Sequence, residues 1–298
     1  MLQRMLTLDR PIDLVLTLGP HRRGLADPTI RLDPRHVIRA TRTADGPATL
    51  ELRVVGDRVE VCAWGPGAAA AVDAVPDLVG ERDDRTDFRP GHRLIQELDR
   101  RMCGLRISRT GAVLEALVPA ILEQKVTGGE ARRGYRGIIA RWGEPAPGSF
   151  GLRLLPDPNV LASIPYHEMH PLGIERRRAD LIRTVAQRAD RFEEIVDLPL
   201  GAAYARLTAL PGIGPWTAAE VGLRALGDRD AVSVGDYHLP NLVTYALTGQ
   251  RRGTDEQMLE LLEPYRGHRA RVVRLIELSG LWPEPHGPHM APRSIAAI

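Results

Sequence analysis

The sequence predicts an α+β protein, in which a small N-terminal antiparallel β-sheet domain precedes a larger all-α domain. Three observations support this prediction. The chain has 298 residues, which exceeds the usual size of a single domain. Apolar and polar residues alternate over residues 49–64, as they do in strands. From Phe88 onward apolar residues recur every three or four positions, as they do in helices, and short Pro- and Gly-containing connections separate these segments.

Residues 1–88 are expected to form the sheet domain. Its candidate strands are residues 12–18, 36–43, 49–55 and 58–64. The last two flank Gly56-Asp57, which is typical of a hairpin with a two-residue turn. A short Ala-rich helix is expected over residues 67–75, and the charged stretch 80–87 resembles a linker.

Residues 89–282 are expected to form the all-α domain, and residues 283–298 a Pro- and His-rich tail that is ordered only where it docks. The helices are expected over residues 94–102, 113–122, 129–142, 174–191, 201–210, 216–226, 239–247, 255–265 and 268–281.

The composition excludes several classes of protein. No apolar run approaches the roughly 18 residues that span a bilayer. The first residues lack the apolar stretch of a signal peptide, so we expect a soluble, cytoplasmic protein without a membrane partner. Cys62 and Cys103 are too few for a disulfide framework, a four-thiolate zinc site or an iron-sulfur cluster. None of the nine His lies in a zinc-binding pattern, so no catalytic metal is expected.

The most informative segment is Leu-Pro-Gly-Ile-Gly-Pro-Trp-Thr at residues 210–217, between two helical patterns. Gly212 and Gly214 let the backbone turn tightly and approach another molecule without obstruction by a Cβ atom. Pro215 suits the first turn of the next helix, whose free N–H groups favour an anion such as a phosphate. Such a contact fixes register without reading sequence. Taken alone, the segment is more typical of a plain structural turn, since many helical hairpins use glycine.

Asp236 follows Gly214 by 22 residues, in the sequence Val-Ser-Val-Gly-Asp-Tyr-His. This span covers one helix, a short polar loop and the start of another helix, so Asp236 is expected to return beside the turn. An alternative is that Asp236 caps the next helix, as Asp often does. Both interpretations can hold at once.

In these two motifs the chain resembles the helix-hairpin-helix (HhH-GPD) superfamily of DNA glycosylases, and specifically its alkylpurine branch of the 3-methyladenine DNA glycosylase II type. The likeness includes residues 121–124, Gly173-Ile174 before an Arg-rich helix, and Pro264-Tyr265-Arg266. The β-rich start resembles the TBP-like N-terminal domain of that branch. The resemblance covers nearly the whole chain, and its specificity lies in the pairing of the glycine turn with Asp236.

The resemblance implies a base excision repair enzyme that hydrolyses the N-glycosidic bond of a damaged base, flipped out of double-stranded DNA. The family's catalytic carboxylate corresponds to Asp236, which would stabilise positive charge on the sugar and orient or deprotonate water. Bifunctional relatives carry a lysine nucleophile two residues after the second hairpin glycine. Trp216 stands there, and Lys125 is the only lysine of the chain, so a monofunctional enzyme without lyase activity is implied.

The resemblance implies no cofactor apart from a monovalent cation at the hairpin, and we expect a monomer associated with the nucleoid. The residues expected to contact DNA are Gly212, Ile213, Gly214, Thr217 and Lys125. Those expected to line the base pocket are Trp216, Tyr237, Tyr265, Glu220 and Gln124. Aromatic rings suit a cationic alkylated purine through cation–π attraction, although each ring taken singly is as consistent with core packing.

Two departures from the branch leave the lesion open. Glu220 stands where an aromatic residue tends to pack against the base. It is expected either to hydrogen-bond or protonate a neutral base, or to pair with Arg224 at the surface. Lys125 stands where an apolar wedge would fill the gap left by the flipped base. Lys125 is expected to bind a phosphate instead, or the neighbouring Val126 is expected to be the wedge.

The net charge of +2 does not argue for DNA binding by itself. Two groups of arginines either contact phosphates or form solvated helix faces: Arg176, Arg177, Arg178, Arg183 and Arg188, and Arg132, Arg133 and Arg136. Two further alternatives stay open: a glycosylase for an oxidised, deaminated or mismatched base, and a non-catalytic DNA-binding or damage-sensing protein.

Overall fold

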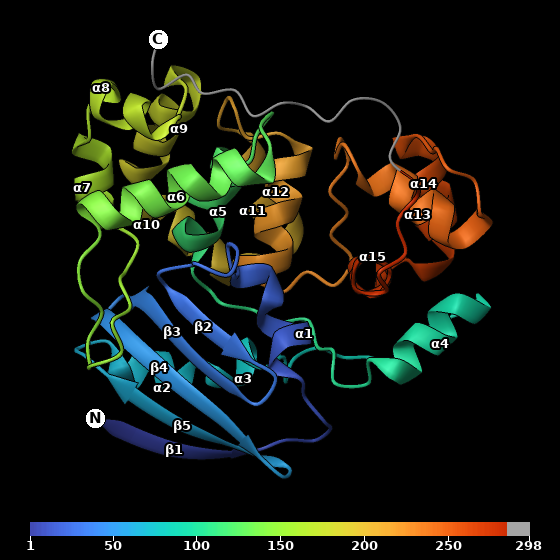
Figure 1. Cartoon of the computed structure of the whole chain (residues 1–298). Coiled ribbons are helices and arrows are strands. Elements are labelled where there is room, and N and C mark those ends of the chain that lie inside the picture. Colours follow the sequence, from blue (N-terminus) through green and yellow to red (C-terminus); the bar gives the residue numbers. More distant parts are fainter. Residues whose placement is uncertain (285–298) are drawn as a thin grey trace.

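The computed structural model describes residues 1–284 and has the predicted α+β class, with an N-terminal antiparallel sheet followed by helices (Figure 1). The sheet has the strand order β1-β5-β4-β3-β2, and all neighbouring strands are antiparallel. The strands are β1 (Leu2–Thr7), β2 (Ile30–Asp33), β3 (His36–Thr43), β4 (Gly46–Val55) and β5 (Arg58–Trp64).

The predicted hairpin is confirmed. Val55 of β4 pairs with Arg58 of β5 around a turn in which Gly56 has φ +65°. The alternation buries one face of the sheet: Leu50, Leu52, Val59 and Val61 are almost inaccessible. Helices α2 (Ala68–Asp73) and α3 (Val75–Leu78) contribute to the same core.

The prediction of a strand over residues 12–18 is wrong, because Leu14–Leu18 form helix α1. The Asp13 carboxylate accepts from the Leu16 N–H and caps this helix. Leu14 and Leu18, one turn apart, both face the core of the sheet domain. Strands β1 and β2 were not predicted. Each lies at an edge of the sheet. Most β1 side chains are exposed, so no alternation of apolar and polar residues marks β1 in the sequence.

The helical part follows the predicted order. Its longer helices are α4 (Arg93–Arg101), α5 (Val113–Leu122), α6 (Gly128–Trp142), α9 (Arg176–Ala186), α11 (Leu200–Thr208), α12 (Pro215–Val221), α13 (Leu239–Thr248), α14 (Asp255–Leu262) and α15 (Arg269–Leu278). The shorter ones are α7 (Pro158–Ser163), α8 (Tyr166–Met169) and α10 (Ala189–Glu193). The single helix expected over residues 174–191 is therefore two helices, α9 and α10. No helix within residues 1–284 is long and apolar enough to cross a bilayer.

The helices enclose two hydrophobic cores. Helices α5, α6 and α9–α12 surround the first, called here the central core. Helix α4 crosses to α13–α15 and forms the second with them, called here the C-terminal core. In Figure 1 the sheet lies below the central helices, and α4 and α13–α15 lie to one side. Residues 227–238, which carry Asp236, connect α12 and its extension to α13.

The stretch 80–87, which resembled a linker, contains the fully buried carboxylate of Asp83. Asp83 accepts from Arg10 at 3.0 Å, from the Ile107 N–H at 3.0 Å, and from Arg271 on α15. This segment is therefore packed between the sheet domain and the C-terminal core. The expected tail, residues 283–298, lies outside the described residues except for its first two.

Candidate active site

The glycine turn joins α11 to α12 and is fixed on its inner side. Gly212 has φ +104°, and a Cβ atom there would lie 2.9 Å from Cδ2 of Leu181, so only glycine fits. Ile213 is buried in the central core. At Gly214, a Cβ atom would meet nothing within 4 Å. The turn is therefore held from within and open at Gly214.

The first N–H groups of α12 are available to a ligand. Gly214 supplies no side chain to cap the helix, and the first backbone N–H groups of a helix have no intrahelical acceptor. Pro215 lacks an N–H, so those of Trp216 and Thr217 follow it directly. This arrangement can bind an anion at the helix start.

Gln124, at the end of α5, secures the turn. Its Nε2 donates to the Gly212 carbonyl at 3.0 Å and to Oγ1 of Thr217 at 2.9 Å. Thr217 is buried, so its hydroxyl supports the turn from inside. Gln124 was expected in the base pocket, and the structure places its amide nitrogen on the hairpin.

The carboxylate of Asp236 is held on both oxygens. Oδ1 accepts from the N–H groups of His238 at 2.8 Å and Leu239 at 2.9 Å, at the start of α13. Oδ2 accepts from the indole Nε1 of Trp216 at 3.0 Å. The helix cap and the approach to the hairpin therefore coexist, since Trp216 comes two residues after Gly214. Within residues 1–284, Asp236 forms no ion pair.

Of the three expected aromatic residues, Trp216 contacts this carboxylate and Tyr237 is its neighbour in sequence. Trp216 is half-buried and bonded to it, whereas Tyr237 is 85% exposed. The Tyr237 ring meets His238 edge-on at 4.8 Å, and His238 lies 6.4 Å from the ring of Trp282. Trp282 is half-exposed and was missed by the sequence analysis, because it follows the last helix outside any motif.

Tyr265 lies elsewhere. It is 8% exposed and packs in the C-terminal core. Burial raises the pKa of its phenol, while a hydrogen bond with the backbone of His92 acts in the opposite direction. Its position is that of a core residue.

Glu220 forms the ion pair with Arg224 that one alternative anticipated, but the pair is largely buried, at 13% and 14% exposed. Its second oxygen accepts from the Ser233 hydroxyl at 2.6 Å. Burial lowers the pKa of Arg224, but the negative charges of Glu220, Glu123 and Glu277 and the hydrogen bond to Glu220 together outweigh that effect, so the net pKa is raised.

Lys125 is exposed and has φ +55°, the only positive φ of a non-glycine residue within residues 1–284. It lies between α5 and α6, two residues before Thr127, which forms a capping box with Glu130. Val126 is half-buried and packs against the central core. The side chain of Lys125 therefore extends from a tight turn at the end of α5.

The arginines divide by burial. Arg178 is buried and donates to the Leu122 carbonyl at the end of α5, so it is not available to a phosphate. Arg176 lies over the ring of Tyr166, 4.4 Å from its centroid. The exposed members of the two groups are Arg132, Arg133, Arg136, Arg176, Arg177 and Arg188.

No group of three or more His, Cys, Asp or Glu within residues 1–284 could hold a metal ion. At the hairpin, the carbonyls of Leu210, Gly212 and Gly214 each accept a protein N–H. A monovalent cation could therefore be coordinated only by the second lone pair of each of these carbonyl oxygens. These residues give no independent support for a cation there.

Comparisons with known proteins agree on the fold. No family model matches the chain. It is 33% identical over 139 residues to the "Probable bifunctional transcriptional activator/DNA repair enzyme AlkA" of Mycobacterium tuberculosis. The match covers 46% of this chain and 28% of that protein, so the chain spans under a third of the relative's length.

Among solved structures, the 3-methyladenine DNA glycosylase of Archaeoglobus fulgidus matches with a TM-score of 0.75 and 19% identity, covering 92% of this chain and 97% of the other. The apo form of the Clostridium acetobutylicum 8-oxoguanine glycosylase/lyase matches with a TM-score of 0.69 and 13% identity, covering 92% and 95%. The latter protein has also been solved with double-stranded DNA containing cytosine opposite 8-oxoG. At these identities the matches establish the fold.

Proposed function

We propose that this chain, which has the fold of the helix-hairpin-helix DNA glycosylases, is a DNA glycosylase that uses Asp236 as its catalytic carboxylate. One observation carries the proposal. The Asp236 carboxylate is bonded to the Trp216 indole, and Trp216 belongs to the first turn of the helix that the glycine turn opens. A DNA phosphate on that turn would bring a nearby sugar to the carboxylate.

A single carboxylate suits this reaction. As the N-glycosidic bond breaks, positive charge develops on the sugar, and a fixed negative charge beside it lowers the barrier. Asp236 also has an orientation suited to a second task, because bonds from two N–H groups and an indole hold it in one rotamer. From there it would orient or deprotonate the attacking water.

We propose that the enzyme is monofunctional. Trp216 occupies the position at which lyases of this fold carry their lysine, and an indole has no amine to attack the sugar. Lys125 is the one lysine side chain in the sequence. Borohydride reduction during the reaction is expected to trap no protein–DNA adduct, and a trapped adduct would contradict the assignment.

We propose an alkylated purine as the substrate. The similarity to AlkA and to the 3-methyladenine glycosylase fold favours this class. The half-buried Trp216 ring and the exposed Tyr237 ring offer π faces to a cationic base. An alkylated cationic base also leaves readily, so no acid on the enzyme need protonate it.

The decisive experiment is an excision assay on duplex oligonucleotides, each with one methylated, deaminated or oxidised base, followed by alkali cleavage of abasic sites. Release of methylated purines would support both the glycosylase activity and the proposed substrate class. Release of only oxidised or deaminated bases would support the activity and contradict an alkylated purine as the substrate. Tight binding of damaged duplex without any release would support a damage-sensing protein instead.

Asp236→Asn is expected to retain DNA binding and to reduce excision at least 100-fold; full activity in this variant would remove Asp236 from the mechanism.

A further inference from the structure

We propose that Glu220 is a positioning residue, which holds the loop carrying Asp236 through the hydroxyl of Ser233 and is itself anchored to the N-terminal domain by Arg224. This inference rests on the proposed role of Asp236. The loop concerned is residues 232–236, called here the Asp236 loop.

Helix α12 holds the Asp236 loop at two points. Trp216 and Glu220 are four residues apart and share one face of the helix. Trp216 donates to the Asp236 carboxylate at 3.0 Å, and Glu220 accepts from Ser233 at 2.6 Å. The Asp236 N–H donates back to the Ser233 carbonyl at 3.2 Å and closes the turn between them. One hydroxyl and one backbone turn therefore connect Glu220 to Asp236.

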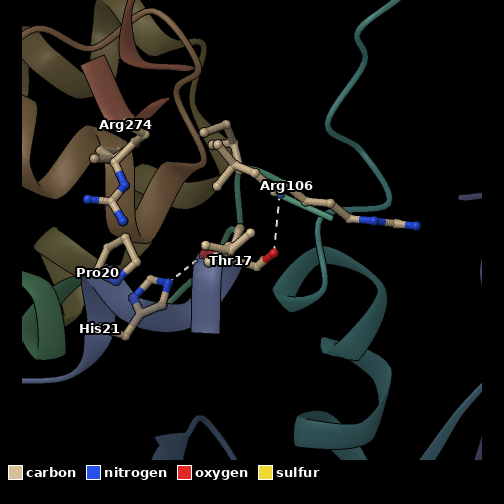
Figure 2. Close-up of a pocket in the computed structure, with 10 residues that line it drawn as sticks. Thr17, Pro20, His21, Arg106 and Arg274 are labelled. Carbon is tan, nitrogen blue, oxygen red and sulfur yellow. Dashed lines mark hydrogen bonds between the residues drawn. The ribbon is translucent and has the colours of Figure 1, made fainter. Parts of the chain in front are cut away.

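Arg224 fixes Glu220 from the opposite side. Its Nη1 donates to the Glu220 carboxylate, and its Nε donates to the Pro20 carbonyl at 2.9 Å. Pro20 belongs to the 3-10 helix Gly19–His21, which follows α1 in the sheet domain. Figure 2 shows Pro20 and His21 beside a small cavity between this helix and Arg274 of α15. The chain of contacts thus runs from the sheet domain to the Asp236 loop.

The backbone around Arg224 is arranged for this contact. Residues Gly222–Leu226 form a π-helical turn, which leaves carbonyl groups without their usual partners. The Arg224 carbonyl accepts from the N–H and the hydroxyl of Thr110, each at 3.2 Å. At Gly222, a Cβ atom would lie 1.9 Å from the Tyr204 hydroxyl, so the turn requires glycine there. These contacts keep the Arg224 guanidinium directed at Glu220 and Pro20.

The contact between Glu220 and Ser233 adds to a second contact that restrains the Asp236 loop. Gly235 has φ +88°, and its N–H donates to the Asp255 carboxylate, at 3.0 and 3.2 Å. Displacing a catalytic group by about 1 Å can reduce a rate by about 100-fold. The charge of Arg224 also keeps Glu220 from adding an uncompensated negative charge to the site. Both Glu220 oxygens accept hydrogen bonds, which favours positioning over protonation of a base.

The test compares single-turnover excision and DNA affinity for Ser233→Ala and Glu220→Gln. Ser233→Ala removes the hydroxyl and leaves the buried ion pair intact. Matched controls are Ser163→Ala and Glu168→Gln, which alter an exposed serine and a partly exposed ion pair with Arg141. Each test variant is expected to lose about tenfold in rate with DNA affinity within about twofold of wild type. The double variant should lose no more than the worse single variant, because both changes cut one connection.

Other results overturn the proposal: wild-type rates in Ser233→Ala, losses confined to DNA affinity, or fully additive losses in the double variant. A readout that needs no activity accompanies these rates. In 15N-tryptophan-labelled protein, the Trp216 indole resonance, assigned with Trp216→Phe, reports its bond to Asp236. Ser233→Ala and Glu220→Gln should shift it, and the controls should not. If the wild type releases no base, the proposed function fails, and this resonance still decides whether Glu220 positions the loop.

Discussion

Among the residues that the structure describes, the Trp216 indole is the one side-chain donor to Asp236, and it can be removed while an aromatic ring is kept. Trp216→Phe keeps an aromatic face but leaves Oδ2 of Asp236 without its 3.0 Å hydrogen bond. We expect single-turnover excision to fall about tenfold while DNA affinity changes little, since a hydrogen bond to a charged group contributes about 1.5–3 kcal/mol. Trp142→Phe, on a half-buried ring of the central core, is the matched control. Equal rates in the two variants would contradict the assignment.

Lys125 combines an unfavourable backbone conformation with an exposed charge. The left-handed region costs a residue with a Cβ atom about 1–2 kcal/mol, a cost that glycine avoids. Glycine also raises the entropy of the unfolded chain, which offsets part of this gain, so Lys125→Gly is expected to raise stability by a net of about 0.5 kcal/mol in urea unfolding. DNA affinity should fall and its salt dependence should weaken by about one unit, if Lys125 contacts a phosphate.

Lys125→Asn separates these two effects. Asparagine tolerates the left-handed region and has no charge. It should therefore match Lys125→Gly in its loss of DNA affinity. Wild-type DNA affinity in both variants would show that Lys125 does not contact DNA. Reduced stability in Lys125→Gly would contradict the claim that the backbone conformation of Lys125 destabilises the fold.

Among the helices, α5 is fixed at both ends. Its first N–H groups, those of Val113 and Leu114, donate to the Glu193 carboxylate at 2.8 and 2.9 Å. Its last turn is held by Arg178, which donates to the Leu122 carbonyl at 2.8 Å. Gln124 then follows and secures the glycine turn. The end of α5 is thus placed for its contact with the hairpin by residues distant in sequence.

The cap on α5 predicts a dependence of stability on pH. Burial raises the pKa of Glu193 to about 7, although its hydrogen bonds to Leu114 and Val113 act in the opposite direction. Because the ordinary value is 4.5, the fold favours the neutral acid. The stabilisation is therefore complete below about pH 4.5 and is lost as the pH rises through about 7.

The measurement is urea unfolding of wild type and Glu193→Gln between pH 5 and pH 8. The stability of wild type relative to the variant should fall by about 2 kcal/mol over this range, which allows for residual solvent contact of the carboxyl group. Glu194→Gln, at the exposed neighbouring carboxylate, should follow wild type at every pH. A difference that stays constant with pH would show that Glu193 does not titrate in this range.

The local sequence pattern predicted those helices, strands and turns whose conformation is determined by residues within the segment itself. The β4–β5 hairpin, α5, α12 and the glycine turn each carry their periodicity or turn residues within the segment. Elements determined by distant partners were predicted poorly. Strand β1 is such an element, an exposed edge that depends on β5. The error over residues 12–18 has another cause: this short apolar run suits a strand or a helix, and the local cap by Asp13 accompanies the helix.

The same division applies to the candidate site. Glycine spacing and Asp236 could be identified from sequence, because their chemistry is specific to residue type. The hairpin partners of Gln124 and the contact of Glu220 with Ser233 could not, because Gly212 lies 88 positions from Gln124 and Ser233 lies 13 from Glu220. A side chain's hydrogen-bond partner depends on how helices pack, which the local pattern does not encode.

At the scale of the whole molecule, one fully buried and one partly buried carboxylate connect the cores. Glu115 of α5 accepts from Arg39 at 2.6 Å, from the Thr41 hydroxyl at 2.9 Å and from the Arg42 N–H at 2.9 Å, all on β3. Asp83 makes the corresponding connection to the C-terminal core. Each of these two acids forms hydrogen bonds between the sheet domain and the helices. Because these bonds restrain the two parts relative to each other, we expect the sheet domain and the helices to unfold together.

Asp83 tests this coupling, because its side chain is fully buried between two guanidinium groups. Asp83→Ala leaves Arg10 and Arg271 without their shared carboxylate, and Arg271 is itself inaccessible. Removing one partner of a buried ion pair costs about 3–5 kcal/mol, so a large fall in the urea midpoint is expected, still as one transition. Asp84→Ala, at the adjacent exposed carboxylate, should leave the midpoint close to wild type. Two separate transitions in Asp83→Ala would mean that the sheet domain unfolds alone once this contact is lost, and a midpoint equal to that of Asp84→Ala would mean that Asp83 does not couple the domains.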